Sequence, residues 1–330
     1  MRLFAWYVWK IGLPLIVALA VGYYFYDKLS QPALWSHAFR LRPEWLVPAA
    51  LLYLCAHSVW ARYSVTLLRN QGGKVSVSTG VRAYFISQFG KYVPGKVWVI
   101  LLRMSILGRS LGITRTAVGI TAMYEALVSM AAGAMIGVLL LYTLSDEQSG
   151  LGGYNLYWLA PVALTPIGLV GLNRFVNRVN RWRRGVHAKQ YPRVKLHLVL
   201  GGLLQATIGW LLLGLSLWMT LRGLRADPDP LTWETYLHLT SINALAYVIG
   251  FVAFFMPAGA GFRELALQTL LTLELSRDMN ATAAAALAAV TAIVLRLIWT
   301  IAELTAAGLL YHFAKTHPPL VIDASPEGPE

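Results

Sequence analysis

Residues 281–313 read ATAAAALAAVTAIVLRLIWTIAELTAAGLLYHF. An α-helix that crosses the hydrocarbon core of a bilayer needs about 20 predominantly apolar residues, and this stretch is longer than that. Arg296 and Glu303 are the two full charges within it. We therefore expect one long transmembrane helix over this stretch.

Six further windows of the chain are similarly apolar. They lie near residues 3–26, 45–68, 116–142, 156–172, 196–221 and 235–255. The chain of 330 residues is 57% hydrophobic and 13% charged, whereas soluble domains are usually about 45–50% apolar and 25% charged. A membrane β-barrel would instead show short segments of alternating polarity. The sequence predicts an all-α integral membrane protein, a polytopic helical bundle of about seven to eight spans.

Two more apolar windows, 79–108 and 257–275, each hold a Pro-Gly break beside charged residues. The first break reads KYVPGK over residues 91–96, and the second reads MPAGAGFRE over residues 256–264. Non-helical backbone at membrane depth is tolerated only where protein covers it or where it lines a water-filled cavity. We expect both windows to form broken, re-entrant segments.

The order of these windows repeats weakly along the chain. Two spans, a broken window and a long span with a buried charge occur over residues 3–142 and again over 196–313. Interrupted segments at matching positions in two halves are typical of transporters with a site near the bilayer midplane. We expect one transmembrane domain over residues 1–315, with 143–195 linking the halves through one span and a basic loop. A flexible polar tail is expected over 316–330.

The net charge of +13 has a membrane explanation. Residues 174–195 carry eight Lys and Arg and no acid, which marks a cytoplasmic loop by the positive-inside rule. Counting spans back from this loop puts the N-terminus on the cytoplasmic side of a bacterial-type inner membrane if the window 79–108 enters and leaves the membrane from the cytoplasm. We expect contacts with anionic lipid and none with nucleic acid. The side of the C-terminus and the oligomeric state stay open, a homo-oligomer included.

The second break has the chemistry of an anion site. Pro257 ends the preceding helix, and Gly259 and Gly261 permit non-helical backbone. A new helix is expected to begin near Phe262, with free N–H groups and the positive end of its dipole. Arg263 adds a guanidinium group suited to a phosphate. A simple kinked loop is the alternative interpretation.

The first break repeats this arrangement with Lys91, Pro94, Gly95 and Lys96. Arg103 follows Lys96 by two helical turns and so lies on the same face. We expect cations from both breaks to converge on one phosphate of a lipid headgroup. The alternative is that the two lysines only extend toward headgroups at the cytoplasmic interface.

Charged residues within the predicted spans need partners, because a charge at a helix centre costs about 2.5–3.5 kcal/mol on insertion scales. Glu125 lies in the third full span, and Arg296 and Glu303 share roughly one helix face. Glu264, beside the second break, can cap a helix, pair with Arg263 or carry a proton. These four residues indicate either structural ion pairs or a gating and coupling role, which is the role we expect.

No catalytic or cofactor motif stands out. Cys55 is the single cysteine, which excludes an intrachain disulfide and a cysteine-based zinc site. Walker, HExxH and GxSxG motifs are absent from the sequence. We expect no catalytic residue, no metal and no cofactor. Gly133 and Gly137 predict close helix packing, and His57 is expected to be a hydrogen-bonded core residue.

The motifs KYVPGKVW at residues 91–98 and PAGAGFRE at residues 257–264 resemble those of the membrane domain of the lysylphosphatidylglycerol synthase/flippase family. The resemblance covers roughly residues 3–313. It implies a helical lipid translocase with two re-entrant elements, in which the Pro-Gly segments and Glu264 line the path of the headgroup. The soluble aminoacyl-transfer domain of bifunctional members is not visible here, so aminoacylation of a lipid is not implied.

Three hypotheses of function follow. The first is a flippase or scramblase-like lipid translocase, a transporter and not an enzyme, that moves a phospholipid or isoprenoid-linked lipid across the cytoplasmic membrane. The second is an integral-membrane transferase that modifies a lipid headgroup with Glu264 or Glu125 as base. The third is a non-transporting partner of a lipid enzyme, with residues 174–195 as its docking site. Anionic phospholipids or polyprenyl-linked lipids are the expected partners.

Overall fold

The computed structural model describes residues 41–92, 97–107, 113–143, 194–225, 231–252 and 261–312, together with a few isolated positions. Within these ranges the regular elements are helices, and no strand occurs among them. The spans expected at 3–26 and 156–172 lie almost entirely outside the described residues, the basic loop is described only at scattered positions and at its end, and the tail at 316–330 lies wholly outside them.

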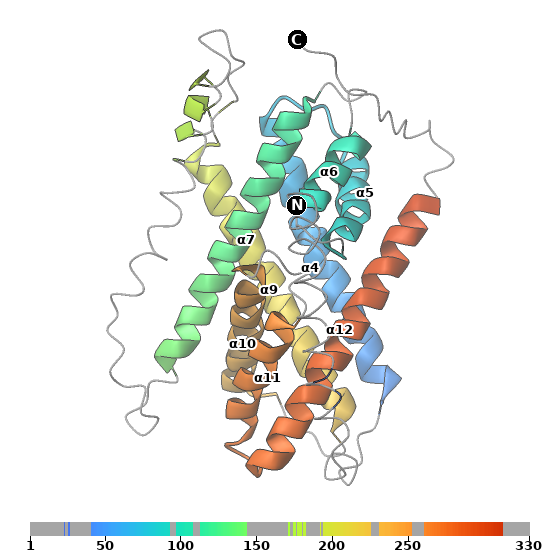
Figure 1. Cartoon of the computed structure of the whole chain (residues 1–330), viewed down its shortest axis with the longest axis vertical. Coiled ribbons are helices and arrows are strands. Elements are labelled where there is room, and N and C mark those ends of the chain that lie inside the picture. Colours follow the sequence, from blue (N-terminus) through green and yellow to red (C-terminus); the bar gives the residue numbers. More distant parts are fainter. Residues whose placement is uncertain are drawn as a thin grey trace, which may run out of the picture.

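The helices follow the apolar windows closely (Figure 1). They are α4 (Pro43–Asn70), α5 (Val77–Ser87), η2 (Gln88–Tyr92), α6 (Val97–Leu107), α7 (Arg115–Thr143), α9 (Leu196–Leu224), α10 (Trp233–Val252), α11 (Phe262–Leu275) and α12 (Ala281–His312). Each of α4, α7, α9, α10 and α12 coincides with a predicted span to within a few residues. These five helix predictions are confirmed.

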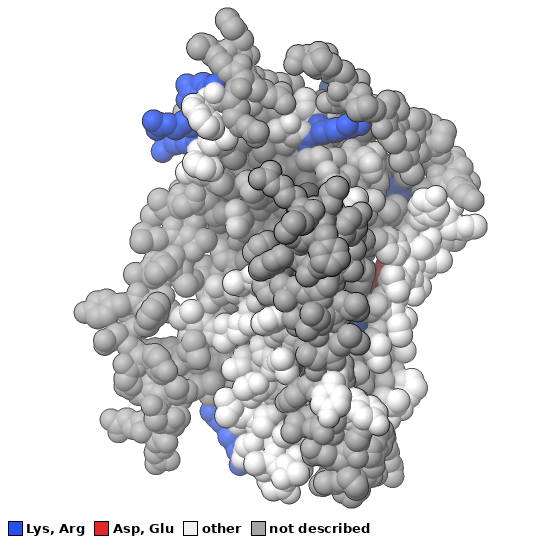
Figure 2. Space-filling view, in the orientation of Figure 1, with Lys and Arg blue, Asp and Glu red and all other residues white. Residues whose placement is uncertain are grey.

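Four of the described helices are long and apolar enough to cross a membrane, namely α7 over 115–138, α9, α10 and α12. α4 has the length, with 28 residues, but it carries Arg62 and His57 and is more polar. On the face seen in Figure 2, the described Lys and Arg side chains gather toward the two ends of the molecule. The protein is therefore a helical, multi-pass membrane protein, and the total of seven to eight spans stays a prediction.

α4 and α9 form an antiparallel pair at the centre of the bundle. At one end, the backbone N–H of Arg42 donates to the carbonyl of Gly223, and the Arg42 guanidinium donates to carbonyls in the last turn of α9. At the other end, the Gln71 side chain donates to the carbonyl of Pro192. Side-chain donors at a helix C-terminus satisfy carbonyls that have no partner within the helix. Both ends of this pair are thus tied together.

Small residues on the long helices allow this close packing. A Cβ atom on Gly133 would lie 2.9 Å from the ring of Trp210, and one on Gly137 would lie 3.1 Å from the side chain of Leu245. The predicted packing role of these two glycines is confirmed. Gly214 of α9 approaches the backbone of Thr240 in the same way, with 2.7 Å between its built Cβ and the Thr240 Cα. Interfaces in membranes depend on such contacts because hydrophobic burial does not distinguish protein from lipid.

Both broken windows contain short helices in the described part of the chain. The window 79–108 becomes α5, η2 and α6, and the window 257–275 becomes α11, which begins at Phe262 as predicted. At 11 and 14 residues, α6 and α11 extend about 16 and 21 Å, which is less than the roughly 30 Å of the hydrocarbon core. The re-entrant path itself stays a prediction, since residues 93–96 and 253–260 lie outside the described ranges.

The short helices of the two halves lie toward opposite ends of the molecule. In Figure 1, α5 and α6 lie at the upper end beside α7, and α10 and α11 extend to the lower end beside α12. α7 of the first half packs on α10 of the second, and α12 of the second half packs on α5 of the first, so the longest helix of each half contacts the other half. The functional residues of both halves are thereby brought to the middle of the bundle.

Candidate functional site

In the described part of the bundle, three ion pairs of a lysine or arginine with a glutamate each join two different helices. The pairs are Arg103–Glu125 between α6 and α7, Lys91–Glu303 between η2 and α12, and Arg296–Glu264 between α12 and α11. All six residues were singled out in the sequence, but their pairing was not. The structure matches one predicted cation to each predicted acid.

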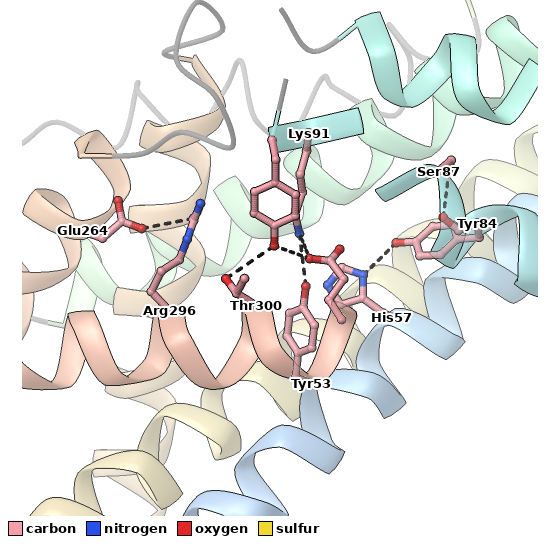
Figure 3. Close-up of polar contacts among 10 residues, drawn as sticks. Tyr53, His57, Tyr84, Ser87, Lys91, Glu264, Arg296 and Thr300 are labelled. Carbon is pink, nitrogen blue, oxygen red and sulfur yellow. Dashed lines mark hydrogen bonds and ion pairs between the residues drawn. The ribbon is translucent and has the colours of Figure 1, made fainter. Parts of the chain in front are cut away.

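Glu303 anchors the first broken segment to α12 (Figure 3). Its Oε2 lies 2.7 Å from the Nζ of Lys91 and accepts a hydrogen bond of 2.7 Å from the Tyr92 hydroxyl. The Lys91 ammonium also donates to the Tyr53 hydroxyl on α4, at 3.3 Å. The end of η2 is therefore fixed to α12 and α4 by a network of charged and hydroxyl groups.

Glu264 fixes the second broken segment in a comparable way. Its Oε2 accepts the backbone N–H of Gly261 at 2.7 Å, and its Oε1 accepts the Arg296 guanidinium at 3.2 Å. Gly261 has a φ of +89°, a backbone conformation that favours glycine. Of the roles left open for Glu264, the structure shows capping of α11, and the carboxylate pairs with Arg296 instead of Arg263; its gating or coupling role stays a prediction. One N–H of the expected anion cradle is thus already bonded within the chain.

Arg103 donates hydrogen bonds to protein atoms from both Nε and Nη1 and is 1% exposed. Its Nη1 lies 2.5 Å from Glu125 Oε2 and 3.2 Å from the Ser64 hydroxyl, and its Nε donates to Ser87 at 3.1 Å. The guanidinium carbon lies 4.8 Å from the ring centre of Tyr84. These contacts hold α4, α5, α6 and α7 together, and a headgroup contact for Arg103 stays a prediction.

A cavity of about 290 Å³ lies where these elements meet. Its cationic lining comes from both broken segments and from α12, in the form of Lys91, Arg103, Arg263 and Arg296. The cations of the two breaks therefore line one cavity, as the sequence led us to expect. Binding of a phosphate by these four cations stays a prediction.

Arg263 differs from the other three cations because it forms no ion pair with a described carboxylate. Its guanidinium carbon lies 4.6 Å from the ring centre of Trp299 and 5.0 Å from that of Tyr247, and the residue is 7% exposed. Aromatic faces hold a guanidinium but leave its in-plane N–H groups available to an acceptor. Gly250 allows this placement, since a Cβ there would lie 2.6 Å from the Cβ of Arg263.

Aromatic and polar residues of α4, α5 and α10 complete the lining, and the sequence analysis largely missed them. His57, Trp60, Tyr63, Tyr84 and Tyr247 all border the cavity. Nδ1 of His57 lies 3.0 Å from the Tyr84 hydroxyl, which confirms the expected hydrogen-bonded core histidine. The sequence signal for this part of the lining is the concentration of polar and aromatic residues in α4.

The remaining predicted site residues cannot be located. Pro94, Gly95, Lys96, Pro257 and Gly259 lie outside the described residues. Their proposed contacts with a headgroup therefore stay predictions.

Comparison with known proteins places this arrangement in a family. No curated protein matches the chain. The family model described as "Lysylphosphatidylglycerol synthase TM region" matches residues 11–302, which is most of the chain and includes both broken segments and all of the cavity lining. The chain therefore belongs to the lysylphosphatidylglycerol synthase TM family, a family of membrane domains associated with lipid handling.

Proposed function

We propose that this protein is a lipid translocase, flippase or scramblase-like, which moves a phospholipid or isoprenoid-linked lipid across a bacterial-type cytoplasmic membrane. The observation that carries the proposal is Arg263, a buried guanidinium at a cavity within the bundle that forms no direct ion pair with a described carboxylate. A buried cation without a counter-charge is costly in a membrane unless it meets an anion or water. The phosphate of a lipid headgroup supplies that anion.

The ion pairs of α12 support a gating role around this cavity. Glu303 holds the first broken segment through Lys91, and Arg296 holds the second through Glu264. A phosphate that enters beside Arg296 competes with Glu264 for the same guanidinium, because both are anionic oxygen acceptors. Binding of the headgroup phosphate to Arg296 then releases Glu264, so that α11 is no longer held to α12 through this ion pair.

The test is leaflet exchange in proteoliposomes that contain the full chain and a trace of fluorescent anionic phospholipid. We expect the wild type to raise the exchange rate above that of empty vesicles, and Arg263→Gln to lower it about 10- to 100-fold, the range expected for a lost charged hydrogen bond. Arg115→Gln is the matched control, because Arg115 is exposed at the start of α7 and does not line the cavity.

Three outcomes contradict the proposal. A wild-type rate equal to that of empty vesicles, for both phospholipid and polyprenyl phosphate probes, excludes translocation of these lipids. A new lipid species that forms only when a group donor is added favours the headgroup transferase instead. If Arg263→Gln and Arg115→Gln lower the rate of leaflet exchange equally, the cavity takes no part in translocation.

A further inference from the structure

A histidine–glutamate pair joins α10 and α11 outside the cavity. Nδ1 of His238 lies 2.8 Å from Oε1 of Glu274, and neither residue lines the cavity. Among the ion pairs between described residues, this is the one that includes a histidine. Histidine is the side chain whose charge ordinarily changes between pH 5 and 8. This contact can therefore change its charge near neutral pH, whereas the lysine and arginine pairs of the bundle keep theirs.

The pair lies close to an aqueous end of the molecule. His238 is 5% exposed, but Oε2 of Glu274 lies 3.6 Å from Nε of Arg277, whose side chain is 47% exposed. Residues 276–278, which follow α11, are all exposed. In Figure 1 this end of the α10 and α11 pair is at the bottom of the molecule. A proton from water therefore reaches the pair through a local opening of one layer of side chains.

Glu274 is the charged group that faces His238. α10 packs against α7, α9 and α11. Neither the described part of α7 beyond residue 125 nor α9 over residues 198–221 carries a charged residue. The other charged residues near this end of α10 and α11 are exposed, and they are Glu234, Arg277 and Asp278. The charge on His238 is thus balanced chiefly by one carboxylate.

α11 connects this pair to the cavity. Glu274 lies in the last turn of α11, and Arg263, which lines the cavity, lies in its first turn. At that first turn α11 again lies against α10, because a Cβ atom on Gly250 would be 2.6 Å from the Cβ of Arg263. The helix between the two ends extends about 16 Å. A change in the contact of α11 with α10 at one end therefore acts on the position of the other.

The two ends of α11 are held by ion pairs of different kinds. Glu264 pairs with Arg296 of α12, which keeps its charge, and Glu274 pairs with His238, which is charged only when protonated. A charge-assisted hydrogen bond is about twice as strong as a neutral one. Oε2 of Glu274 has no hydrogen-bond partner among the described atoms, so the Glu274 carboxylate depends on His238 for its compensation. Loss of the His238 proton therefore weakens the hold on the last turn of α11.

We propose that the His238–Glu274 pair is a proton-binding site that controls how firmly α11 is held to α10 and, through α11, the position of Arg263. In acid, protonated His238 pairs with Glu274 and holds α11 against α10, with Arg263 at the cavity. As the pH rises, His238 loses this proton and α11 separates more readily. The proposal goes beyond the function proposed above, because the hold on α11 does not depend on what the cavity binds.

Hydrogen–deuterium exchange of the full chain in lipid nanodiscs tests the proposal at about pH 5.5 and about pH 7.5, on either side of the ordinary titration of histidine. Labelling times are scaled for the intrinsic pH dependence of amide exchange. Uptake in residues 262–275 is divided by uptake in α4, which does not pack closely on α10 or α11. We expect this ratio to rise about fivefold at the higher pH, the difference between a charged and a neutral hydrogen bond.

Two variants should abolish this change. His238→Gln keeps an amide donor but cannot gain a proton, and Glu274→Gln removes the charge with which protonated His238 pairs. In both variants we expect the same ratio at the two pH values. His197→Gln is the matched control, because His197 is exposed at the start of α9, and it should keep the fivefold change. Because each reading is a ratio within one sample, a lower yield of folded protein does not imitate the result.

A wild-type ratio that is the same at both pH values overturns the proposal. A fivefold change that survives in both His238→Gln and Glu274→Gln also overturns it, because another group then binds the proton. A rise confined to residues 272–275 contradicts control of Arg263 through α11. None of these readings uses leaflet exchange, so failure of this proposal and failure of the proposed function are distinguishable.

Discussion

At the scale of single residues, the buried cations near the two breaks differ in the groups that surround them. The Arg103 guanidinium meets a carboxylate and two hydroxyls, whereas the Arg263 guanidinium meets two aromatic faces. The sequence showed both as basic residues near a Pro-Gly break and gave no reason to distinguish them. The distinction depends on Glu125, which reaches Arg103 only because α6 and α7 pack together.

Glu125→Gln should lower the stability of the protein by about 3–5 kcal/mol, because it leaves the buried Arg103 charge without its partner. The measurement is the thermal unfolding midpoint in detergent, compared with Glu44→Gln. Glu44 is exposed at the start of α4 and makes a suitable control. Replacing Arg103 and Glu125 together by leucine should cost less than Glu125→Gln alone. Equal midpoints for Glu125→Gln and Glu44→Gln would show that the pair is not important for stability.

At the scale of elements, glycines decide which helices come close. The long helices were predictable because an apolar window of about 20 residues is a local property of the chain. Their neighbours were not predictable, because a glycine in a helix has the same local sequence whether or not it faces another helix. On α9, Gly201 has open space where a Cβ would be, whereas Gly214 faces the backbone of Thr240.

Gly214→Ala should therefore destabilise the contact of α9 with α10 by about 1–3 kcal/mol, the usual cost of overpacking. Gly201→Ala should be neutral or stabilising by up to about 1 kcal/mol, because alanine is the better helix former and meets no atom there. Unfolding midpoints of the two variants in the same detergent check this. A lower unfolding midpoint for Gly201→Ala than for Gly214→Ala would contradict the close contact of Gly214 with Thr240.

At the scale of the whole molecule, α12 connects the two broken segments through residues two helical turns apart. Glu303 binds Lys91 of η2, and Arg296 binds Glu264 of α11. The sequence predicted that the two charges of α12 share one face, and it could not assign their partners. Tyr92 and Glu303, for example, are 211 positions apart in the chain.

Because each charge of α12 holds a different segment, the two contacts should be separable by hydrogen–deuterium exchange. Glu303→Gln should raise deuterium uptake several-fold in residues 77–107 and leave residues 262–275 near the wild-type value. Arg296→Gln should have the reverse effect. Mass spectrometry of peptides from the full chain gives both readings in one sample. Uptake that rises equally in both segments in either variant would show that α12 does not hold them separately.

The sequence by itself determined that this protein is a helical membrane protein, where five of its long helices run and where two apolar windows are interrupted. It also supplied the charged residues of the site, because a charge in an apolar stretch is visible locally and needs a partner. The tertiary structure alone decided which acid each cation pairs with, that Arg263 meets aromatic rings and forms no ion pair with a described carboxylate, and that His57, Tyr63 and Tyr84 line the same cavity. The physical reason is that pairing and cavity shape depend on how distant helices pack, and that packing depends on small residues whose neighbours the local sequence does not specify.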